Sequence, residues 1–314
     1  MKRLVLGIDT SCYTTSVALA GDGRVVASAR KLLTVADGQR GLRQSDGLFQ
    51  HVNQLPEMVD QLMSQMDEFE LAAVCASARP RDVDDSYMPV FLAGVSLGRS
   101  IARINGVPFF ETCHQKGHVR AAMVDSGIEK GPFVAMHLSG GTTETLLVDE
   151  NMNISLIGGS NDLHAGQFVD RVGVKMGLSF PAGPHLEELA VKGQAKSLFP
   201  LSHKDGHCSF SGAEAQAMRV IEKGDLGKED IAAEVYNYLA RAITWLLQDA
   251  FEKTGANQAL LAGGVASSRL LRKLVSERMR KKGVHKKICW ARPELSGDNA
   301  CGVALLGEEL LSAK

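Results

Sequence analysis

Short apolar segments separated by small polar turns open the chain. Residues 4–8 and 16–20 are apolar and β-prone, and the residues between them are small and rich in hydroxyl groups, which predicts a hairpin with a polar turn. The same arrangement returns at 133–138 and 145–148, around a turn at 139–144. The sequence therefore contains an internal repeat at the level of pattern.

Helical periodicity alternates with buried strands along the rest of the chain. Residues 57–66, directly after Pro56, and residues 89–105 have apolar positions at helical spacing, whereas 72–76 is apolar throughout, as in a buried strand. From Ile231 to Phe251 one apolar face persists, which predicts a long core helix. A short strand at 259–262 then leads into a Gly-rich turn at 263–268 and a further helix. This alternation indicates an α/β protein.

The length of the chain predicts two lobes. At 314 residues and 33.7 kDa it exceeds the size at which a single core usually keeps growing. Gly131 and Pro132 interrupt the pattern before the second hairpin. We assign 1–108 to the first lobe and 109–314 to the second, with the C-terminal helix, at about 298–312, able to pack back on the first lobe.

Composition excludes several classes of protein. Apolar residues make up 45% and charged residues 23% of the chain, and no uncharged apolar stretch reaches the length of a membrane span. Asp9 interrupts the first apolar run well before the length of a signal-peptide core. We therefore expect a cytoplasmic protein without membrane contact. The six cysteines form no C-x-x-C pair and are expected to be buried thiols: Cys12, Cys75, Cys113, Cys208, Cys289 and Cys301.

One segment concentrates positive charge, although the formal net charge is only -1. Between residues 269 and 292 the single acid is Glu277. A solvated helix face explains such a run in most proteins, and contact with an RNA backbone is the alternative. The ten basic residues are Arg269, Arg272, Lys273, Arg278, Arg280, Lys281, Lys282, Lys286, Lys287 and Arg292.

Three small-residue turns, at 9–15, 139–143 and 263–268, each follow an apolar strand. Backbone N–H groups in such turns can approach phosphate oxygens without a side-chain clash. Their order is typical of actin, sugar kinases and heat-shock ATPases, which clamp a nucleotide between two lobes. Neither the P-loop nor the Rossmann fingerprint is present. We predict a two-lobed actin-like ATPase (ASKHA) fold with duplicated ribonuclease-H-like lobes.

A pair of histidines provides the second chemical signal. His114 and His118 are four residues apart, so both project from one face of a helix and can share a metal ion. Asp298, beside Gly297, is the best candidate for a third ligand. Two unrelated surface histidines remain the alternative interpretation. A zincin protease needs a glutamate after the first histidine, and here that residue is Gln115.

Together these motifs resemble the TsaD family, once called glycoproteases, over almost the whole chain. The motifs are, in chain order, GIDTSC at 7–12, His114 with His118, LSGGT at 138–142, 170–184, SFSG at 209–212, AGGVA at 262–266 and DNA at 298–300. The resemblance implies an actin-like fold and transfer of a threonylcarbamoyl group from its adenylate to an adenosine of tRNA. It also implies TsaB-like and TsaE-like proteins as partners.

The resemblance also implies a set of site residues. The metal, iron or zinc, would be held by His114, His118 and Asp298. ATP or threonylcarbamoyl-adenylate would be the nucleotide ligand, and Asp9 and Asp170 are the candidate catalytic carboxylates. The candidate binding residues are Thr10, Ser11, Leu138, Ser139, Gly140, Gly141, Thr142, Asp170, Gly183, Gly263, Gly264 and Ser268.

Several positions depart from the family pattern. Members of the family read Asp-Glu-Thr where this chain has Tyr13, Thr14 and Thr15, so two carboxylates are absent from the first turn. The pattern suggests a diverged paralogue that keeps the metal site and the nucleotide cleft. Two other hypotheses stay open at this point. One is a noncatalytic nucleotide-binding partner of such an enzyme, and the other is a metallopeptidase, which Gln115 disfavours.

Overall fold

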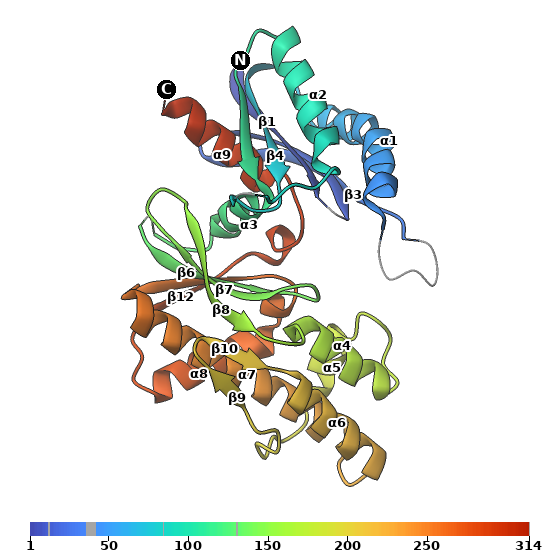
Figure 1. Ribbon diagram of the computed structural model, residues 1–314, viewed down its shortest axis with the longest axis vertical. Coiled ribbons are helices and arrows are strands. Elements are labelled where there is room, and N and C mark those ends of the chain that lie inside the picture. Colours follow the sequence, from blue (N-terminus) through green and yellow to red (C-terminus); the bar gives the residue numbers. More distant parts are fainter. Residues whose placement is uncertain (12, 36–41, 84, 130, 314) are drawn as a thin grey trace. The chain divides into compact units, whose positions relative to one another are not determined.

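The computed structural model describes residues 1–11, 13–35, 42–83, 85–129 and 131–313 (Figure 1). By its internal contacts the chain forms two compact units. The first is Met1–Val124 with Glu294–Lys314, and the second is Asp125–Pro293. The division at residue 108 assigns 109–124 to the second lobe, whereas these residues belong to the first unit by contact. The C-terminal segment also belongs to the first unit.

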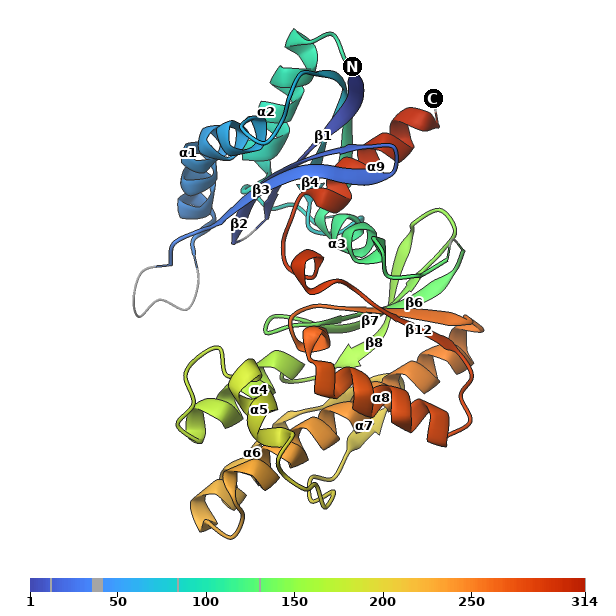
Figure 2. The same ribbon diagram turned by 180° about the vertical axis from the view of Figure 1, so that it is seen from behind.

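The first unit is built on a five-stranded sheet with the order β3-β2-β1-β4-β5. Neighbours within β1, β2 and β3 are antiparallel, and β1, β4 and β5 run parallel. Four helices, α1, α2, α3 and α9, complete the unit (Figures 1 and 2). The bounds are β1 Lys2–Ser11, β2 Thr14–Gly21, β3 Arg24–Leu32, α1 Gln44–Met63, β4 Phe69–Arg79, α2 Phe91–Ile104, β5 Phe109–Cys113, α3 His114–Met123 and α9 Cys301–Ser312.

Side-chain alternation along β1 decides which helices cover which face of this sheet. Leu4, Leu6 and Ile8 pack in a core with residues of α1 and α2. The residues between them point the other way, because successive side chains of a strand alternate. A Cβ at Gly7 would lie 2.4 Å from the backbone N of Ala304 in α9. Only a glycine therefore allows α9 to lie this close to β1.

The second unit is built on a seven-stranded sheet with the order β12-β11-β6-β7-β8-β10-β9. Helix α7 packs against this sheet, and α5 and α8 pack against α7. The bounds are β6 Phe133–Leu138, β7 Thr143–Val148, β8 Ile154–Ser160, α4 Ala165–Lys175, α5 Gly183–Ala190, β9 Ser202–Lys204, β10 His207–Ser209, α6 Ser211–Lys223, α7 Lys228–Thr254, β11 Gln258–Ala262, a 3-10 turn Val265–Ser267, α8 Arg269–Lys281 and β12 Lys287–Trp290.

The two sheets share one topology, which explains the repeat in the sequence. The order β3-β2-β1-β4-β5 corresponds strand for strand to β8-β7-β6-β11-β12. In both, three antiparallel strands are followed by two parallel ones. The predicted hairpins at 4–20 and 133–148 are β1-β2 and β6-β7. The α/β class and the duplicated lobes are as predicted.

Two elements differ from the expectations at their ends. Helix α1 begins at Gln44 and contains Pro56 in its interior, whereas we expected a helix to start after that proline. Residues of the earlier turns, including His51 and Leu55, are buried, so packing outweighs the missing proline N–H. Asp298 does not open a helix, because α9 begins at Cys301.

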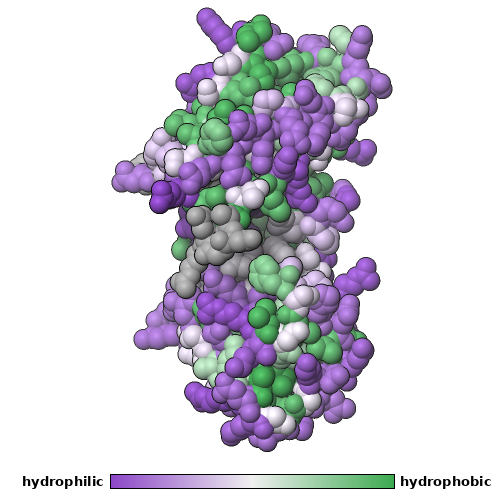
Figure 3. Space-filling view, turned by 90° about the vertical axis from the view of Figure 1, so that its right-hand side faces the viewer, coloured by the Kyte–Doolittle hydropathy of each residue, from purple (hydrophilic) through white to green (hydrophobic). Residues whose placement is uncertain are grey.

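The described surface is mostly hydrophilic on the face shown in Figure 3, where hydrophobic residues form small groups. None of the helices in the described part of the chain combines the length and the apolarity that crossing a bilayer requires. Cys75, Cys113, Cys208, Cys289 and Cys301 are buried free thiols, whereas Cys12 lies outside the described residues.

Candidate functional site

Helices α3 and α9 of the first unit meet backbone to backbone, and this contact positions the histidine pair. A Cβ at Gly302 in α9 would lie 1.9 Å from the carbonyl oxygen of Gly117 and 2.7 Å from the amide of Ala121 in α3. Neither distance is sterically possible, so only glycine fits at 302. Gly117 lies between His114 and His118. The contact therefore brings both imidazoles beside the segment that leads into α9.

Three predicted metal ligands converge at this point. His114, His118 and Asp298 each offer one ligand atom, and these atoms lie within 4.8 Å of one another. The Nε2 atom of His118 is 2.9 Å from Oδ1 of Asp298, and Nε2 of His114 is 3.6 Å from the same oxygen. The two rings lie edge to face, with centroids 4.3 Å apart. Two imidazole nitrogens and one carboxylate oxygen are a donor set that suits a divalent transition metal.

Asp9 holds the first of these imidazoles in place. Its carboxylate is fully buried, and each of its oxygens lies 3.1 Å from Nδ1 of His114. The hydroxyl of Ser77 donates to the same carboxylate. Because a carboxylate can only accept, Nδ1 carries the proton and Nε2 is the atom left to face a metal. Asp9 thus fixes the orientation of a candidate ligand.

Two further contacts hold the segment that carries Asp298. The hydroxyl of Thr14 lies 3.4 Å from Oδ2 of Asp298, and the guanidinium of Arg30 lies 3.4 Å from its backbone oxygen. The side chain of Asn299 accepts a hydrogen bond at 3.0 Å from the amide of Cys301, the first residue of α9. These contacts hold Asp298 in place although it lies outside any helix or strand.

The other predicted residues of the first turn are buried in the first unit. The hydroxyl of Thr10 donates to the carbonyl of Val90 at 3.0 Å and accepts from the amide of Gly94 at 3.2 Å. It therefore anchors the start of α2. Ser11 is only 2% exposed, and its hydroxyl has no hydrogen-bond partner among the described residues.

We expect the affinity of the metal-free protein for a metal to rise with pH. Burial opposes protonation of His114, but the charge and hydrogen bond of Asp9, together with the charge of Asp298, outweigh it and raise the pKa of His114 to about 9. Nδ1 keeps its proton toward Asp9, and a metal must displace the second proton, on Nε2, so affinity should increase roughly tenfold per pH unit below pH 9. The opposite sign applies to stability without metal. The contact of protonated His114 with Asp9 stabilises the fold fully below pH 6.5, the pKa of this histidine in the unfolded chain. This stabilisation is lost as the pH rises through about 9, the pKa in the folded protein.

Titration with chelator-buffered Zn²⁺ at pH 7, 8 and 9 measures this dependence. The Asp9→Asn variant removes the charge that raises the pKa, so its affinity should level off at lower pH. Equal affinities of the unsubstituted protein at all three pH values would contradict the expectation.

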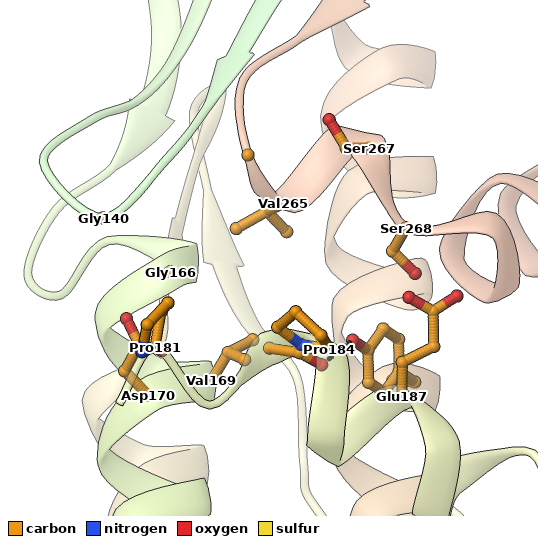
Figure 4. A pocket seen from close by; sticks show the side chains of 13 residues that line it. Gly140, Gly166, Val169, Asp170, Pro181, Pro184, Glu187, Val265, Ser267 and Ser268 are labelled. Atoms are coloured by element: carbon orange, nitrogen blue, oxygen red, sulfur yellow. Dashed lines mark hydrogen bonds between the residues drawn. The ribbon is translucent and has the colours of Figure 1, made fainter. Parts of the chain in front are cut away.

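The second unit contains a cavity of about 430 Å³ that gathers predicted residues from four separate segments (Figure 4). Gly140, Asp170, Gly183, Gly264 and Ser268 all line it. The remaining predicted residues of this unit, Leu138, Ser139, Gly141, Thr142 and Gly263, belong to the same turns but are not among the lining residues. Residues of the second and third turns thus line one cavity, whereas Thr10 and Ser11 of the first turn belong to the other compact unit and are not among its lining residues.

Close backbone contacts shape the walls of this cavity. A Cβ at Gly166 would lie 2.6 Å from the amide nitrogen of Gly140, and the amide of Gly166 donates to the carbonyl of Ser139 at 3.0 Å. Gly263 has a φ of +103°, and a Cβ there would lie 2.3 Å from the carbonyl oxygen of Leu138. By contrast, a Cβ at Gly140, Gly141 or Gly264 would meet no atom within 4 Å. The turns are therefore held by backbone contacts at Gly166 and Gly263, whereas space is open beside Gly140, Gly141 and Gly264.

Comparison with known proteins identifies the family. The family model described as TsaD: tRNA N6-adenosine threonylcarbamoyltransferase matches residues 48–305. The chain belongs to the TsaD family. It is 31% identical to a protein of that name from Pediococcus pentosaceus over 98% of this chain and 91% of the relative. It is 28% identical to one from Thermosipho africanus over 98% of this chain and 94% of the relative.

Solved structures confirm the fold class of this TsaD-family chain. A ROK family glucokinase from Streptomyces griseus, solved with glucose and AMPPNP, matches with a TM-score of 0.54. The match covers 98% of this chain and 99% of the glucokinase at 14% identity. At that identity the likeness shows the fold alone. It confirms the two-lobed actin-like fold predicted from the three turns.

Eight of the residues that line the cavity of this TsaD-family chain were not among the candidate site residues, and two of these, Glu187 and Tyr236, have ionisable side chains. Glu187 lines the cavity, and its Oε1 accepts a hydrogen bond from the amide of Leu270 at 2.7 Å. A possible signal was its position one helical turn after Gly183, on the same face of α5. Tyr236 also lines the cavity, but it lies within the apolar face of α7, whose periodicity concealed it.

The polar groups of this cavity have defined roles as donors and acceptors. Oδ1 of Asp170 accepts from the amide of Ala182 at 2.8 Å. The hydroxyl of Tyr236 donates to the carbonyl of Gly183 at 3.1 Å. Burial and then the charge of Glu187 raise the pKa of Tyr236 far above its usual range, so the phenol stays protonated. The cavity is therefore lined both by carboxylate acceptors, Asp170 and Glu187, and by the open glycine turns at Gly140 and Gly264.

Proposed function

We propose that this chain is a metal-dependent transferase that moves a threonylcarbamoyl group from its adenylate to an adenosine of tRNA. The observation that carries the proposal is the convergence of His114, His118 and Asp298 within 4.8 Å, in a chain whose family model is that of a tRNA threonylcarbamoyltransferase. TsaB-like and TsaE-like proteins are the partners we propose on the basis of the family. The compartment we propose is the cytoplasm.

The candidate metal site would supply the electrophilic part of this chemistry. His114, His118 and Asp298 would hold an iron or zinc ion, which would provide a Lewis acid toward an acyl oxygen. Asp9 is a positioning residue in this proposal, because its carboxylate is buried and directed at Nδ1 of His114. Thr14 is a second positioning residue in this proposal, since its hydroxyl lies 3.4 Å from Oδ2 of Asp298, whereas Oδ1 is the oxygen that contacts His118.

The cavity of the second unit holds the nucleotide in this proposal. Its carboxylates, Asp170 and Glu187, suit the hydroxyl groups of a ribose, because a carboxylate accepts hydrogen bonds and repels phosphate. The phosphate would lie against the backbone of residues 139–142 and Gly264, because a Cβ added at Gly140, Gly141 or Gly264 would meet no atom within 4 Å and space is therefore open beside these glycines. Asp170 thus binds substrate in this proposal, and the sequence-based hypothesis of a catalytic role for it stays open.

Complementation in vivo tests the transfer reaction. A strain depleted of its own TsaD protein should express this chain, and mass spectrometry should measure threonylcarbamoyl-adenosine in its tRNA. Modified adenosine that depends on His114 and His118 would support the proposal. Its complete absence, with metal and nucleotide binding intact, would instead favour a noncatalytic nucleotide-binding protein.

The same strain tests the two carboxylates that this chain lacks. If they matter, the Tyr13→Asp, Thr14→Glu double variant should modify more adenosine than the unsubstituted chain, because acyl transfer to an amine needs groups that manage a proton and the adenylate charge. The Tyr87→Asp variant is a control for the Tyr13 substitution alone, because Tyr13 and Tyr87 are both exposed whereas Thr14 is buried. Full modification by the unsubstituted chain would show that the diverged-paralogue hypothesis is wrong.

Gly264→Val is expected to abolish stabilisation by a purine nucleotide while the protein stays folded. A ligand that binds only the folded state raises the melting temperature by mass action. Gly264 lies in an ordinary helical conformation with φ -59°, and nothing lies within 4 Å of an added Cβ, so a valine occupies the cavity without displacing the protein. Thermal melts with ATP measure the shift. Gly212→Val, at an equally open glycine, is the control, and equal shifts in the two variants would contradict the cavity assignment.

A further inference from the structure

The basic segment 269–292 divides into two groups in the structure. Six of its ten cations contact other residues of the second unit. Arg272 donates to the carbonyl of Ala266, and Arg278 donates to the side chain of Asn237. Lys282, Lys286, Lys287 and Arg292 contact Gln248, Asn257, Glu129 and Asp125. These six cations make contacts within the second unit, so their presence in the basic segment requires no ligand.

The cations that remain include three that share one face of α8. Arg269, Lys273 and Arg280 are exposed, and among the described residues none of them has a hydrogen-bond or ion-pair partner. With Ser276 they are spaced by four, three and four residues, which places them in one row along the helix. The buried residues of α8, Leu271, Val275 and Met279, point to a different side. The row spans about 16 Å at 1.5 Å per residue.

The row starts at the edge of the cavity described above. Ser268 lines the cavity and is also the N-cap of α8, where its hydroxyl accepts a hydrogen bond from the amide of Leu271 at 3.1 Å. Arg269 is the next residue in the chain. With the adenylate in this cavity, a polymer whose nucleoside is brought up to that adenylate would carry its neighbouring phosphates past Arg269 and along the row.

We propose that the exposed face of α8 formed by Arg269, Lys273 and Arg280 binds the phosphate backbone of the tRNA acceptor. The inference rests on the proposed function for its choice of RNA. Because these three cations have no partner among the described residues, their charges are available to phosphates along a nucleic-acid strand, and contact with each phosphate releases condensed counterions. Glu277 is the only acid on α8, so the face carries a net positive charge.

Binding of an unmodified tRNA transcript to the full chain, measured by fluorescence anisotropy between 50 and 200 mM salt, tests the inference. The variant Arg269→Gln, Lys273→Gln, Arg280→Gln should lose affinity by about tenfold or more, and its plot of log K against log salt should become shallower by about 2. The matched control is Lys282→Gln, Lys286→Gln, Lys287→Gln, which removes the same charge from cations that have partners. The control should lose less than about threefold.

Three outcomes would overturn the inference: no binding of tRNA by the unsubstituted chain, equal losses in the two triple variants, or no loss in either. Vesicles of anionic phospholipid form a further arm, and binding to them in place of tRNA would also overturn it. The complementation assay separates this inference from the proposed function. If the triple variant of α8 loses tRNA affinity but the unsubstituted chain modifies no adenosine, only the proposed transferase function is wrong. If adenosine is modified but the same triple variant binds tRNA as tightly as the unsubstituted chain, only the inference about the face of α8 is wrong.

Discussion

Replacing either His114 or His118 by alanine, in two separate variants, is expected to reduce bound transition metal from close to one ion per chain to nearly none. Each substitution removes one of three ligand atoms that lie within 4.8 Å of one another. Two remaining ligands cannot complete a site, because metal sites of this type need three or more protein ligands. Elemental analysis of the purified protein measures the metal content.

His285→Ala is the matched control, because this histidine is exposed and lies in the other compact unit. Its metal content should equal that of the unsubstituted protein. Loss of metal in the control, or full metal content in both His114→Ala and His118→Ala, would show that the site is assigned to the wrong residues.

Gly302→Ala is expected to destabilise the protein by about 3 kcal/mol or more and to weaken metal binding. The added methyl group would lie 1.9 Å from the carbonyl oxygen of Gly117, and overpacking of this kind against backbone usually costs about 1–3 kcal/mol or more. Helix α3 carries both histidines, so its displacement from α9 separates them from Asp298. Denaturant unfolding measures the stability, and zinc titration measures the affinity.

Gly212→Ala provides a close control for this prediction. Gly212 is the second residue of α6, as Gly302 is of α9, but nothing lies within 4 Å of an added Cβ there. Alanine should stabilise this position slightly, since it is the better helix former. If both variants were equally stable, the close approach of α3 and α9 would not be what positions the histidines.

The fold could be predicted because its signals are local. Alternation of strands and helices, the repeated hairpin and the three Gly-rich turns are patterns within short windows of sequence. They gave the correct class and the correct positions of β1, β2, β6 and β7. The start of α1 was missed because proline is a local signal for a helix start, whereas burial of His51 and Leu55 is a tertiary effect that outweighs it.

By itself the sequence determined the candidate ligands, the turns and the family, because residue type and spacing limit what chemistry a segment can perform. Only the tertiary structure decided which groups meet. Asp9 and His114 are 105 residues apart in sequence and 3.1 Å apart in space. Glu187 likewise contacts Leu270, which is far from it in the sequence. Only the structure shows that six of the ten basic residues have partners, whereas Arg269, Lys273 and Arg280 have none among the described residues. Such contacts depend on how β-strands and helices pack, and packing joins residues that no window of sequence contains.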